Sequence, residues 1–272
     1  MSIQALAMGA DGSIVAGTSR GRVVRWANGS WEALREMKGG IQDVWVSPSG
    51  AVWMVGARCE RWVGELKKER VKVGDDGFMC VRGMSDLDVW VSGYGPKIAH
   101  WDGRSWQEHD TGLENGASDY IAALGGTHDH VCAGGERGIA RWDGSVWTTI
   151  EESVDTCING GTTWSDGRAV FAGHSAQPEL WFVGRGGFER FVLDEDPLDD
   201  DELQCIAMGP NGRLYFTTGR RLLSWLDGEL RLELRDEKYD CFGVASNGTS
   251  VAAATSKGVW LLEDEWRLIG KP

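Results

Sequence analysis

The sequence lacks the features by which several classes of protein are recognised. It has no apolar run near the roughly 18 residues that a membrane span requires, and its first residues have no basic flank that leads into an apolar stretch. Acidic residues outnumber basic ones by 41 to 28, so the net charge is −13, a sign that repels polyanions. We therefore expect a cytoplasmic chain that contacts neither membrane nor nucleic acid.

Motifs of common catalytic and metal centres are also missing. No H-E-x-x-H and no phosphate-cradling G-x-x-x-x-G-K-[ST] occurs, and the six cysteines show no C-x-x-C spacing. No nucleophile is accompanied by a recognisable base. Without a secretory signal, the cysteines are expected to be reduced and to behave as small buried apolar groups. The sequence thus predicts no catalytic residue, no cofactor and no metal.

Tryptophan, by contrast, is abundant and recurs in phase. The chain has 15 Trp, and nearly the same nine residues occur three times, as VVRWANGSW, IAHWDGRSW and IARWDGSVW from positions 23, 98 and 139. Extending this signature in both directions gives seven similar units, separated by 36 to 45 residues. The units begin near Ile3, Ile41, Phe78, Tyr120, Ile158, Leu203 and Tyr239.

Each unit consists of short apolar or alternating runs between Gly, Asp and Asn, which is typical of strands and hairpins. In the first unit, Asp11-Gly12 and Asn28-Gly29 supply hairpin turns. The sequence therefore predicts an all-β fold, a seven-bladed β-propeller of four-stranded antiparallel blades that occupies residues 1–272 as a single domain. A β-solenoid and a ring of six or eight blades are the alternatives. The predicted strands of the first unit are 3–8, 13–18, 22–26 and 30–34, and the last strand of the chain is 265–269.

The repeats resemble those of known bacterial propellers. The segments IVAGTSRGRVVRWANGSW and HVCAGGERGIARWDGSVW resemble two-component-regulator propeller repeats, and the end of the W-D-G-x-x-W signature is similar to BNR-like repeats. The segment MGPNGRLYFTTGRRLLSW is similar to repeats of streptogramin lyase propellers, but no matching catalytic His accompanies it. The Gly-His pair of WD-repeats is absent, which places the chain outside that family. These motifs are structural, so the resemblance implies a fold and no chemistry.

One column of the repeat is composed mainly of small side chains. Small residues suit the innermost strands, which crowd around the axis. Within this column, Asp43 is expected to bind water in the channel or an Arg such as Arg82, with a catalytic role as the weaker alternative. A thiolate metal site formed by Cys80, Cys205 and Cys241 is a further, weaker alternative. The column, two residues into each unit, is Ala5, Asp43, Cys80, Ala122, Gly160, Cys205 and Cys241.

Antiparallel blades place the longer connections on one face, which we predict to be the functional face. The connections between the second and third strands of six blades carry cations, which we expect to form a basic ring near the mouth of the channel. The ring could bind an anion or an acidic peptide, or could simply keep the turns soluble. Its members are Arg20, Arg22, Arg58, Lys97, Arg137, Arg220, Arg221 and Lys257.

An acidic segment, residues 194–202, is predicted on the same face. It reads DEDPLDDDE, seven carboxylates in nine residues, and is either a solvated loop or a landing site for a basic partner. A calcium loop is disfavoured because its residue pattern is absent. The carboxylates are Asp194, Glu195, Asp196, Asp199, Asp200, Asp201 and Glu202.

The Trp residues are expected to pack where blades meet. Trp53 and Trp164 fit this pattern less well and are predicted to be more exposed. His128 and His130 flank Asp129 in a turn and are expected to be surface residues.

Taken together, these features favour a non-catalytic, monomeric interaction module that binds a protein or peptide partner on the long-loop face. Two alternatives remain. One is a carbohydrate-binding propeller that uses its Trp residues, and the other is a lyase or hydrolase with a site at the channel mouth that uses Asp43 and the basic ring.

Overall fold

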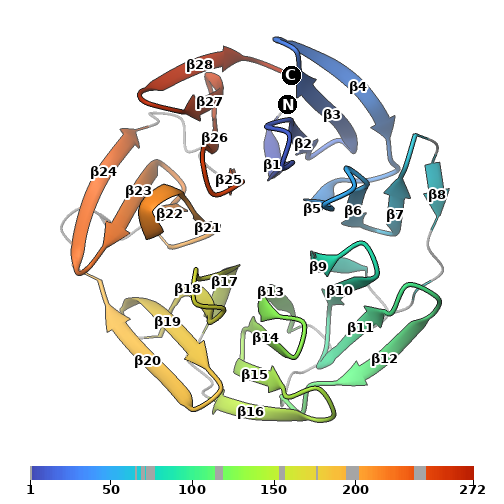
Figure 1. Cartoon of the computed structure of the whole chain (residues 1–272), viewed down its shortest axis with the longest axis vertical. Helices are drawn as coiled ribbons and strands as arrows, with labels where there is room; N and C mark the ends of the chain where they lie inside the picture. Colours follow the sequence, from blue (N-terminus) through green and yellow to red (C-terminus); the bar gives the residue numbers. More distant parts are fainter. Residues whose placement is uncertain are drawn as a thin grey trace.

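The computed structural model of the chain is a ring of seven blades around a central axis (Figure 1). It describes residues 2–64, 66–68, 71, 77–113, 119–152, 157–175, 177–193, 202–235 and 243–272. Each blade is a four-stranded antiparallel sheet whose strands follow one another outward from the axis. This confirms the predicted fold class and the number of blades.

Blade 1 contains β1 Ile3–Met8, β2 Ile14–Thr18, β3 Arg22–Ala27 and β4 Ser30–Glu36, and blade 2 contains β5 Ile41–Val46, β6 Val52–Gly56, β7 Cys59–Trp62 and β8 Leu66–Lys68. Blade 3 contains β9 Phe78–Ser85, β10 Asp88–Gly93, β11 Lys97–Trp101 and β12 Trp106–Asp110, and blade 4 contains β13 Ile121–Thr127, β14 His130–Gly135, β15 Gly138–Trp142 and β16 Trp147–Glu152. Blade 5 contains β17 Cys157–Thr163, β18 Ala169–His174, β19 Pro178–Gly184 and β20 Gly187–Val192. Blade 6 contains β21 Ile206–Met208, β22 Leu214–Thr217, β23 Arg221–Leu226 and β24 Glu229–Arg235, and blade 7 contains β25 Gly243–Ser246, β26 Val251–Thr255, β27 Gly258–Leu262 and β28 Trp266–Gly270. A 3₁₀ turn, η1 Pro210–Gly212, lies between β21 and β22 of blade 6. No helix in the described part of the chain is long and apolar enough to cross a membrane.

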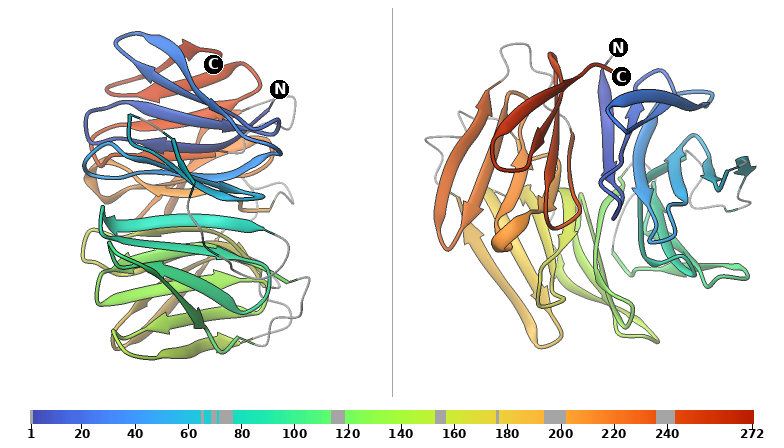
Figure 2. Two further views of the ribbon diagram at one scale, coloured as in Figure 1. Left: turned by 90° about the vertical axis from the view of Figure 1, so that its right-hand side faces the viewer. Right: turned by 45° about the horizontal axis from the view of Figure 1, so that its top comes forward.

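The strands run across the thickness of the ring (Figure 2). The turns from the first to the second strand and from the third to the fourth strand of each blade therefore lie on one side, which we call the hairpin face. The remaining connections lie on the other side, the long-loop face. Asn28 and Gly29 have φ values of 52° and 79°, so this predicted Asn-Gly pair forms a two-residue hairpin turn.

The core lies between the blades. Seven clusters of buried apolar side chains each join two adjacent blades, so every blade buries both of its faces. The junction of blades 1 and 7 follows the same rule, since Leu6 and Ile14 pack with Ala252 and Val259. The ring is closed by contacts between blades 1 and 7 and not by a shared sheet, because each sheet comes from one continuous stretch of chain.

The junction of blades 3 and 4 also contains a polar cluster. Oδ1 of the buried Asp88 accepts hydrogen bonds from Nε1 of Trp90 at 2.9 Å and lies 2.8 Å from Nε2 of His100. The His100 ring stacks on Trp90 with 4.1 Å between centroids. His128, from the first turn of blade 4, contacts the other oxygen of Asp88 through Nδ1. One carboxylate thus ties the two blades together.

Two predictions of exposure at these junctions, those for Trp53 and His130, are wrong. Trp53 is fully buried and packs edge-on against Trp106, because blades 2 and 3 meet there. Trp164 is partly buried against Phe182. His130 is also buried, and this burial lowers the pKa of its ring.

Candidate functional site

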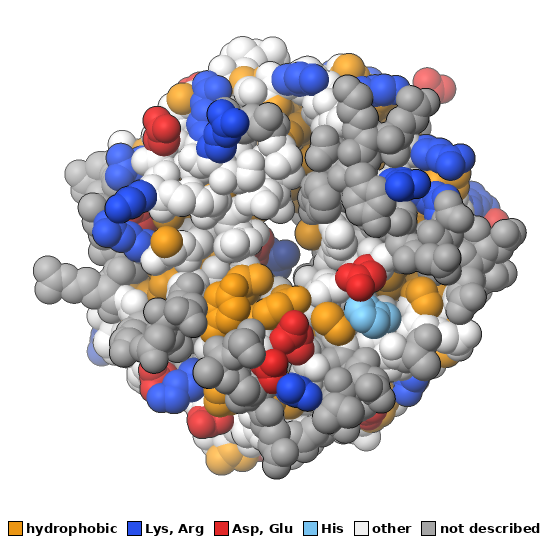
Figure 3. Space-filling view, turned by 180° about the vertical axis from the view of Figure 1, so that it is seen from behind, with side chains coloured by type: hydrophobic (Ala, Val, Ile, Leu, Met, Phe, Trp, Pro, Cys, Tyr) orange, Lys and Arg blue, Asp and Glu red, His pale blue; other side chains and the backbone are white. Residues whose placement is uncertain are grey.

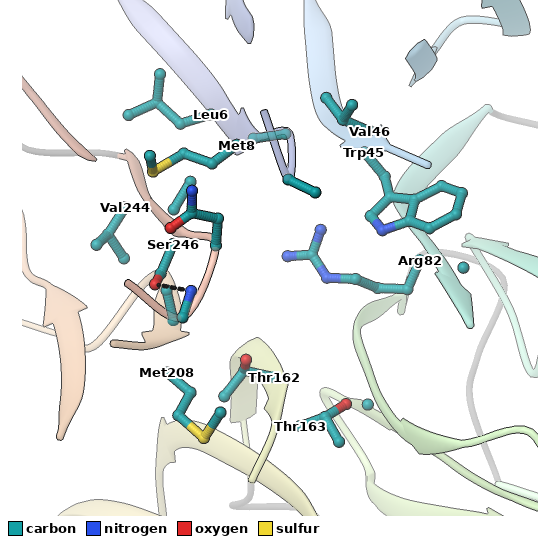
Figure 4. A pocket seen from close by; sticks show the side chains of 18 of the residues that line it. Leu6, Met8, Trp45, Val46, Arg82, Thr162, Thr163, Met208, Val244 and Ser246 are labelled. Atoms are coloured by element: carbon teal, nitrogen blue, oxygen red, sulfur yellow. Dashed lines mark hydrogen bonds between the residues drawn. The ribbon is translucent and has the colours of Figure 1, made fainter. Parts of the chain in front are cut away.

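A cavity of about 490 Å³ opens on the hairpin face at the axis of the ring. Its walls are the last residues of the innermost strand of every blade, so seven strands hold it rigidly. Figure 4 shows residues from several blades around the funnel, with the guanidinium of Arg82 near its middle. We call this cavity the axial funnel. The lining residues used below are Met8, Trp45, Arg82, Met84, Thr162, Thr163, Met208, Val244 and Asn247.

The lining of the funnel is chemically simple. Arg82 carries the only charge among the lining residues described, in a chain whose net charge is −13. Methionines from blades 1, 3 and 6 and aliphatic side chains supply the apolar wall. Hydroxyl groups of Ser and Thr and the amide of Asn247 add neutral polar groups. The funnel therefore offers an adaptable apolar surface with one cation.

Close packing of blades 2 and 3 fixes one wall. A Cβ atom added to Gly83 would lie 2.2 Å from Cη2 of Trp45, so only glycine lets the indole of β5 lie flat against β9. Thr163 is also fixed, because its hydroxyl donates to the carbonyl of Gly126 at 3.0 Å and accepts from the N–H of the same residue. These contacts hold the funnel wall in one shape.

Arg82, on β9, extends to the middle of the funnel (Figure 4). Its Nη1 donates to the carbonyl of Val81 at 3.3 Å and lies 3.5 Å from Oδ2 of Asp43. The side chain of Arg82 remains 29% exposed. Of the two partners expected for Asp43, water and an arginine, the structure shows the arginine.

Asp43 is held mainly by the backbone. Its Oδ1 accepts from the N–H of Val44, and its Oδ2 accepts from the N–H of Val81 in the next blade, both at 2.9 Å. Both carboxylate oxygens therefore have a partner besides the guanidinium. Asp43 acts as a bridge between β5 and β9.

A second, smaller cavity of about 140 Å³ lies on the long-loop side of Arg82. Asp43, Cys80, Cys205 and Arg82 all line it, so three of the four predicted channel residues come together, and Cys241 lies outside the described residues. Burial, followed by the nearby Asp43 carboxylate, raises the pKa of the Cys80 thiol well above its usual value, and the same causes raise that of Cys205 to about 11. Both thiols are protonated at neutral pH. Within the described ranges no group of three or more His, Cys, Asp or Glu is arranged to hold a metal ion.

The predicted basic residues do not converge on the channel. They lie beside connections between the second and third strands, and Figure 3, which views the long-loop face, shows basic side chains spread over its outer part. Arg221 is buried, Arg137 pairs with Asp119 at 2.7 Å, and Lys97 pairs with Glu108 at 2.6 Å. The remaining five, all exposed, are Arg20, Arg22, Arg58, Arg220 and Lys257.

Most of the predicted acidic segment lies outside the described residues. This applies to Asp194, Glu195, Asp196, Asp199, Asp200 and Asp201. Glu202 is described and is exposed.

Neither the funnel nor the central place of Arg82 in it was predicted from the sequence. A signal was available in the repeat, in the column four residues into each unit. This column lines the funnel in six blades, and Arg82 is its only charged member. The six residues are Ala7, Trp45, Arg82, Leu124, Thr162 and Ala207.

Comparisons by sequence find no matching family model and no matching curated protein. Comparisons by structure find seven-bladed propellers. Virginiamycin B lyase from Staphylococcus aureus superposes with a TM-score of 0.79 at 14% identity, over 93% of this chain and 91% of the lyase. A catalytically inactive variant of that lyase, solved with quinupristin, gives 0.78 at 15% identity over 93% and 91% of the two chains. The extracellular domain of a protein described as a one component system from B. thetaiotaomicron gives 0.74 at 12% identity, over 96% of this chain and 38% of the other. At these identities the likeness shows the fold alone.

Proposed function

We propose that this chain is a non-catalytic binding module that takes a short peptide segment of a partner protein into the axial funnel. The observation that carries the proposal is the funnel itself, a preformed cavity of about 490 Å³ to which all seven blades contribute. Cavities of this size and mainly apolar lining, with few polar groups, are typical of ligand sites.

The residues in the funnel support binding rather than catalysis. A lyase or hydrolase needs a group that can accept or donate a proton near neutral pH. The described lining has no His, Cys, Asp, Glu, Lys or Tyr. Asp43, the carboxylate considered for catalysis, lies beyond Arg82 with both oxygens engaged by backbone N–H groups. The lyase neighbours therefore lend little support to an enzymatic role.

A peptide suits the lining better than a sugar does. Glycan sites present exposed aromatic faces, but Trp45 is the only aromatic residue among the described lining, and its ring packs against Gly83. Three methionine side chains in the wall can adapt to different apolar side chains. This adaptability is characteristic of surfaces that accept peptides.

The proposal places the partner on the hairpin face rather than on the long-loop face. The basic residues of the long-loop face are spread outward, and two of them are paired with carboxylates. The funnel, by contrast, is one cavity that residues from every blade line. We therefore prefer the funnel as the docking site of a protein or peptide partner.

Affinity selection with a synthetic library of random octapeptides tests the proposal. Thr162 points into the funnel and has no side-chain hydrogen bond within the described residues, so Thr162→Trp should fill the cavity while leaving the ring intact. Thr148, exposed on the outermost strand β16, provides the matched control Thr148→Trp. We expect peptides that the wild type and the control retain and that Thr162→Trp loses by about tenfold or more. Equal retention by all three proteins would contradict the proposal.

A further inference from the structure

We infer that the funnel selects peptides by their free C-terminal carboxylate, with Arg82 as the anchoring residue. This inference rests on the proposed function, since it specifies which end of the peptide enters. It is argued from the charge of the lining, from the loose contacts of Arg82 and from the position of Arg82 in the funnel.

The charge of the lining favours one anionic group. Arg82 is the only charged side chain in the described lining, and no carboxylate on the funnel wall competes for it there. A guanidinium presents a planar set of donors that matches a carboxylate in a two-point geometry. A group of higher negative charge is disfavoured, because Asp43 lies 3.5 Å behind the same guanidinium and the chain as a whole carries −13.

The contacts of Arg82 leave it ready to accept a ligand. Among the described residues, both of its polar contacts involve Nη1, and at 3.3 Å and 3.5 Å they lie at or beyond the long end of the hydrogen-bond range. Asp43 does not depend on Arg82, because the N–H groups of Val44 and Val81 each donate to one of its oxygens at 2.9 Å. A carboxylate that draws the guanidinium toward the funnel therefore leaves Asp43 hydrogen-bonded.

The position of Arg82 favours a chain end. Arg82 lines both the funnel and the smaller cavity behind it, so it lies where the two meet. A peptide that enters from the hairpin face reaches Arg82 with its leading group, while its following side chains contact Met8, Met84 and Met208. The C-terminal carboxylate is the one anion that every unmodified peptide carries at an end.

Two octapeptide libraries that are identical except at the C-terminus test this inference. One ends in the free carboxylate and the other in the carboxamide, and both are presented to the wild type, to Arg82→Met and to Arg82→Lys. The wild type should retain peptides with the free acid about 10- to 100-fold better than amides, as expected for a charge-assisted hydrogen bond. Arg82→Met should lose this preference. Arg82→Lys, which keeps the charge without the planar geometry, should keep part of it.

The outcomes separate the two proposals. Equal retention of acids and amides by the wild type overturns the inference, as does an acid preference that survives in Arg82→Met. Peptides retained equally from both libraries but lost in Thr162→Trp would leave the funnel as the site and remove only the carboxylate anchor. No retention sensitive to Thr162→Trp from either library would overturn the proposed function itself. Thermal unfolding of both Arg82 variants verifies that each is folded before its result is compared.

Discussion

Replacing Asp88 with alanine should destabilise the ring strongly, because one buried carboxylate joins blades 3 and 4. The Asp88 side chain is 5% exposed and accepts hydrogen bonds from Trp90 and His100 in its own blade and from His128 in the next. Asp88→Ala would leave the indole N–H of Trp90 buried without this acceptor, at a cost of about 1–3 kcal/mol. Breaking a buried charged pair typically costs about 3–5 kcal/mol in total. Since His128 is mostly exposed and contributes little, we expect a loss near the low end, about 3 kcal/mol.

The stability lost in Asp88→Ala should depend on pH, because Asp88 and His128 both have shifted pKa values. Burial alone would raise the pKa of Asp88, but hydrogen bonds from His100 and His128 outweigh it and lower the pKa. The stabilisation by Asp88 is therefore present above the ordinary carboxyl pKa and is lost as the pH falls through the lowered value. The hydrogen bond to Asp88 raises the pKa of His128. The stabilisation that protonated His128 contributes is therefore present below its ordinary pKa and is lost as the pH rises through the raised value.

Urea unfolding of the wild type and of Asp88→Ala between about pH 4 and pH 8 measures this effect. The difference in unfolding free energy should be largest near pH 5 to 6, should shrink toward acid, and should fall slightly above pH 7. Asp129→Ala is the control, since Asp129 forms an exposed ion pair with Arg185 and should cost less than about 1 kcal/mol. A loss in Asp88→Ala no larger than that of the control, or one unchanged across the pH range, would refute the reasoning.

Two further predictions concern the funnel. Gly83→Ala places a methyl group against the Trp45 indole and should cost about 1–3 kcal/mol through overpacking, measured by urea unfolding; an unchanged midpoint would contradict the packing described here. Asp43→Asn removes the charge that competes for Arg82 and should tighten binding of a free-acid peptide several-fold, measured by calorimetry. Because the new amide NH2 would face one of the N–H groups of Val44 and Val81, we also expect a loss of about 1–3 kcal/mol in stability. Weaker binding in Asp43→Asn, under conditions where the variant is fully folded, would show that Asp43 supports the site rather than competes with it.

Much of the fold follows from local sequence chemistry. The Asn28-Gly29 pair specifies a two-residue turn because both residues accept positive φ. The W-D-G signatures of blades 3 and 4 mark the turn at the same place in the repeat, but there four residues separate the paired Trp residues. The predicted first strand, 3–8, agrees with β1, and of the six other strand ends predicted for blade 1 three agree and three differ by one or two residues. Local turns and alternation are thus sufficient to set strand order and blade number.

Burial at the blade junctions was harder to predict. Trp53 was expected to be exposed because it does not lie at the repeated Trp position, but it faces blade 3 and is enclosed by Trp106. His130 was expected at the surface because it flanks Asp129 in a turn, but it is buried. Both depend on which face of a strand meets the neighbouring blade, and that contact is made by residues distant in sequence.

The site was predicted only in part. The pairing of Asp43 with Arg82 follows from a lone carboxylate in a column of small residues, because a buried charge requires a partner. The long-loop face was predicted to be the functional face from the lengths of its loops and from the number of charged residues in them. Neither quantity shows how far a side chain lies from the axis of the ring. Arg82 becomes central because β9 places it at the axis, where side chains of all seven blades converge.

Methionine-methyl NMR tests most directly whether the axial funnel is the binding site. The chain has seven Met, of which Met8, Met84 and Met208 line the funnel, while Met37 and Met54 are buried in the core between blades 1 and 2. Chain labelled with ¹³C at the methionine methyl groups is titrated with the free-acid octapeptide that is retained best. We predict saturable shifts of the three funnel methyl signals and unchanged signals for the two core methyl groups. Binding that leaves the three funnel signals unmoved would contradict the assignment of the funnel as the site.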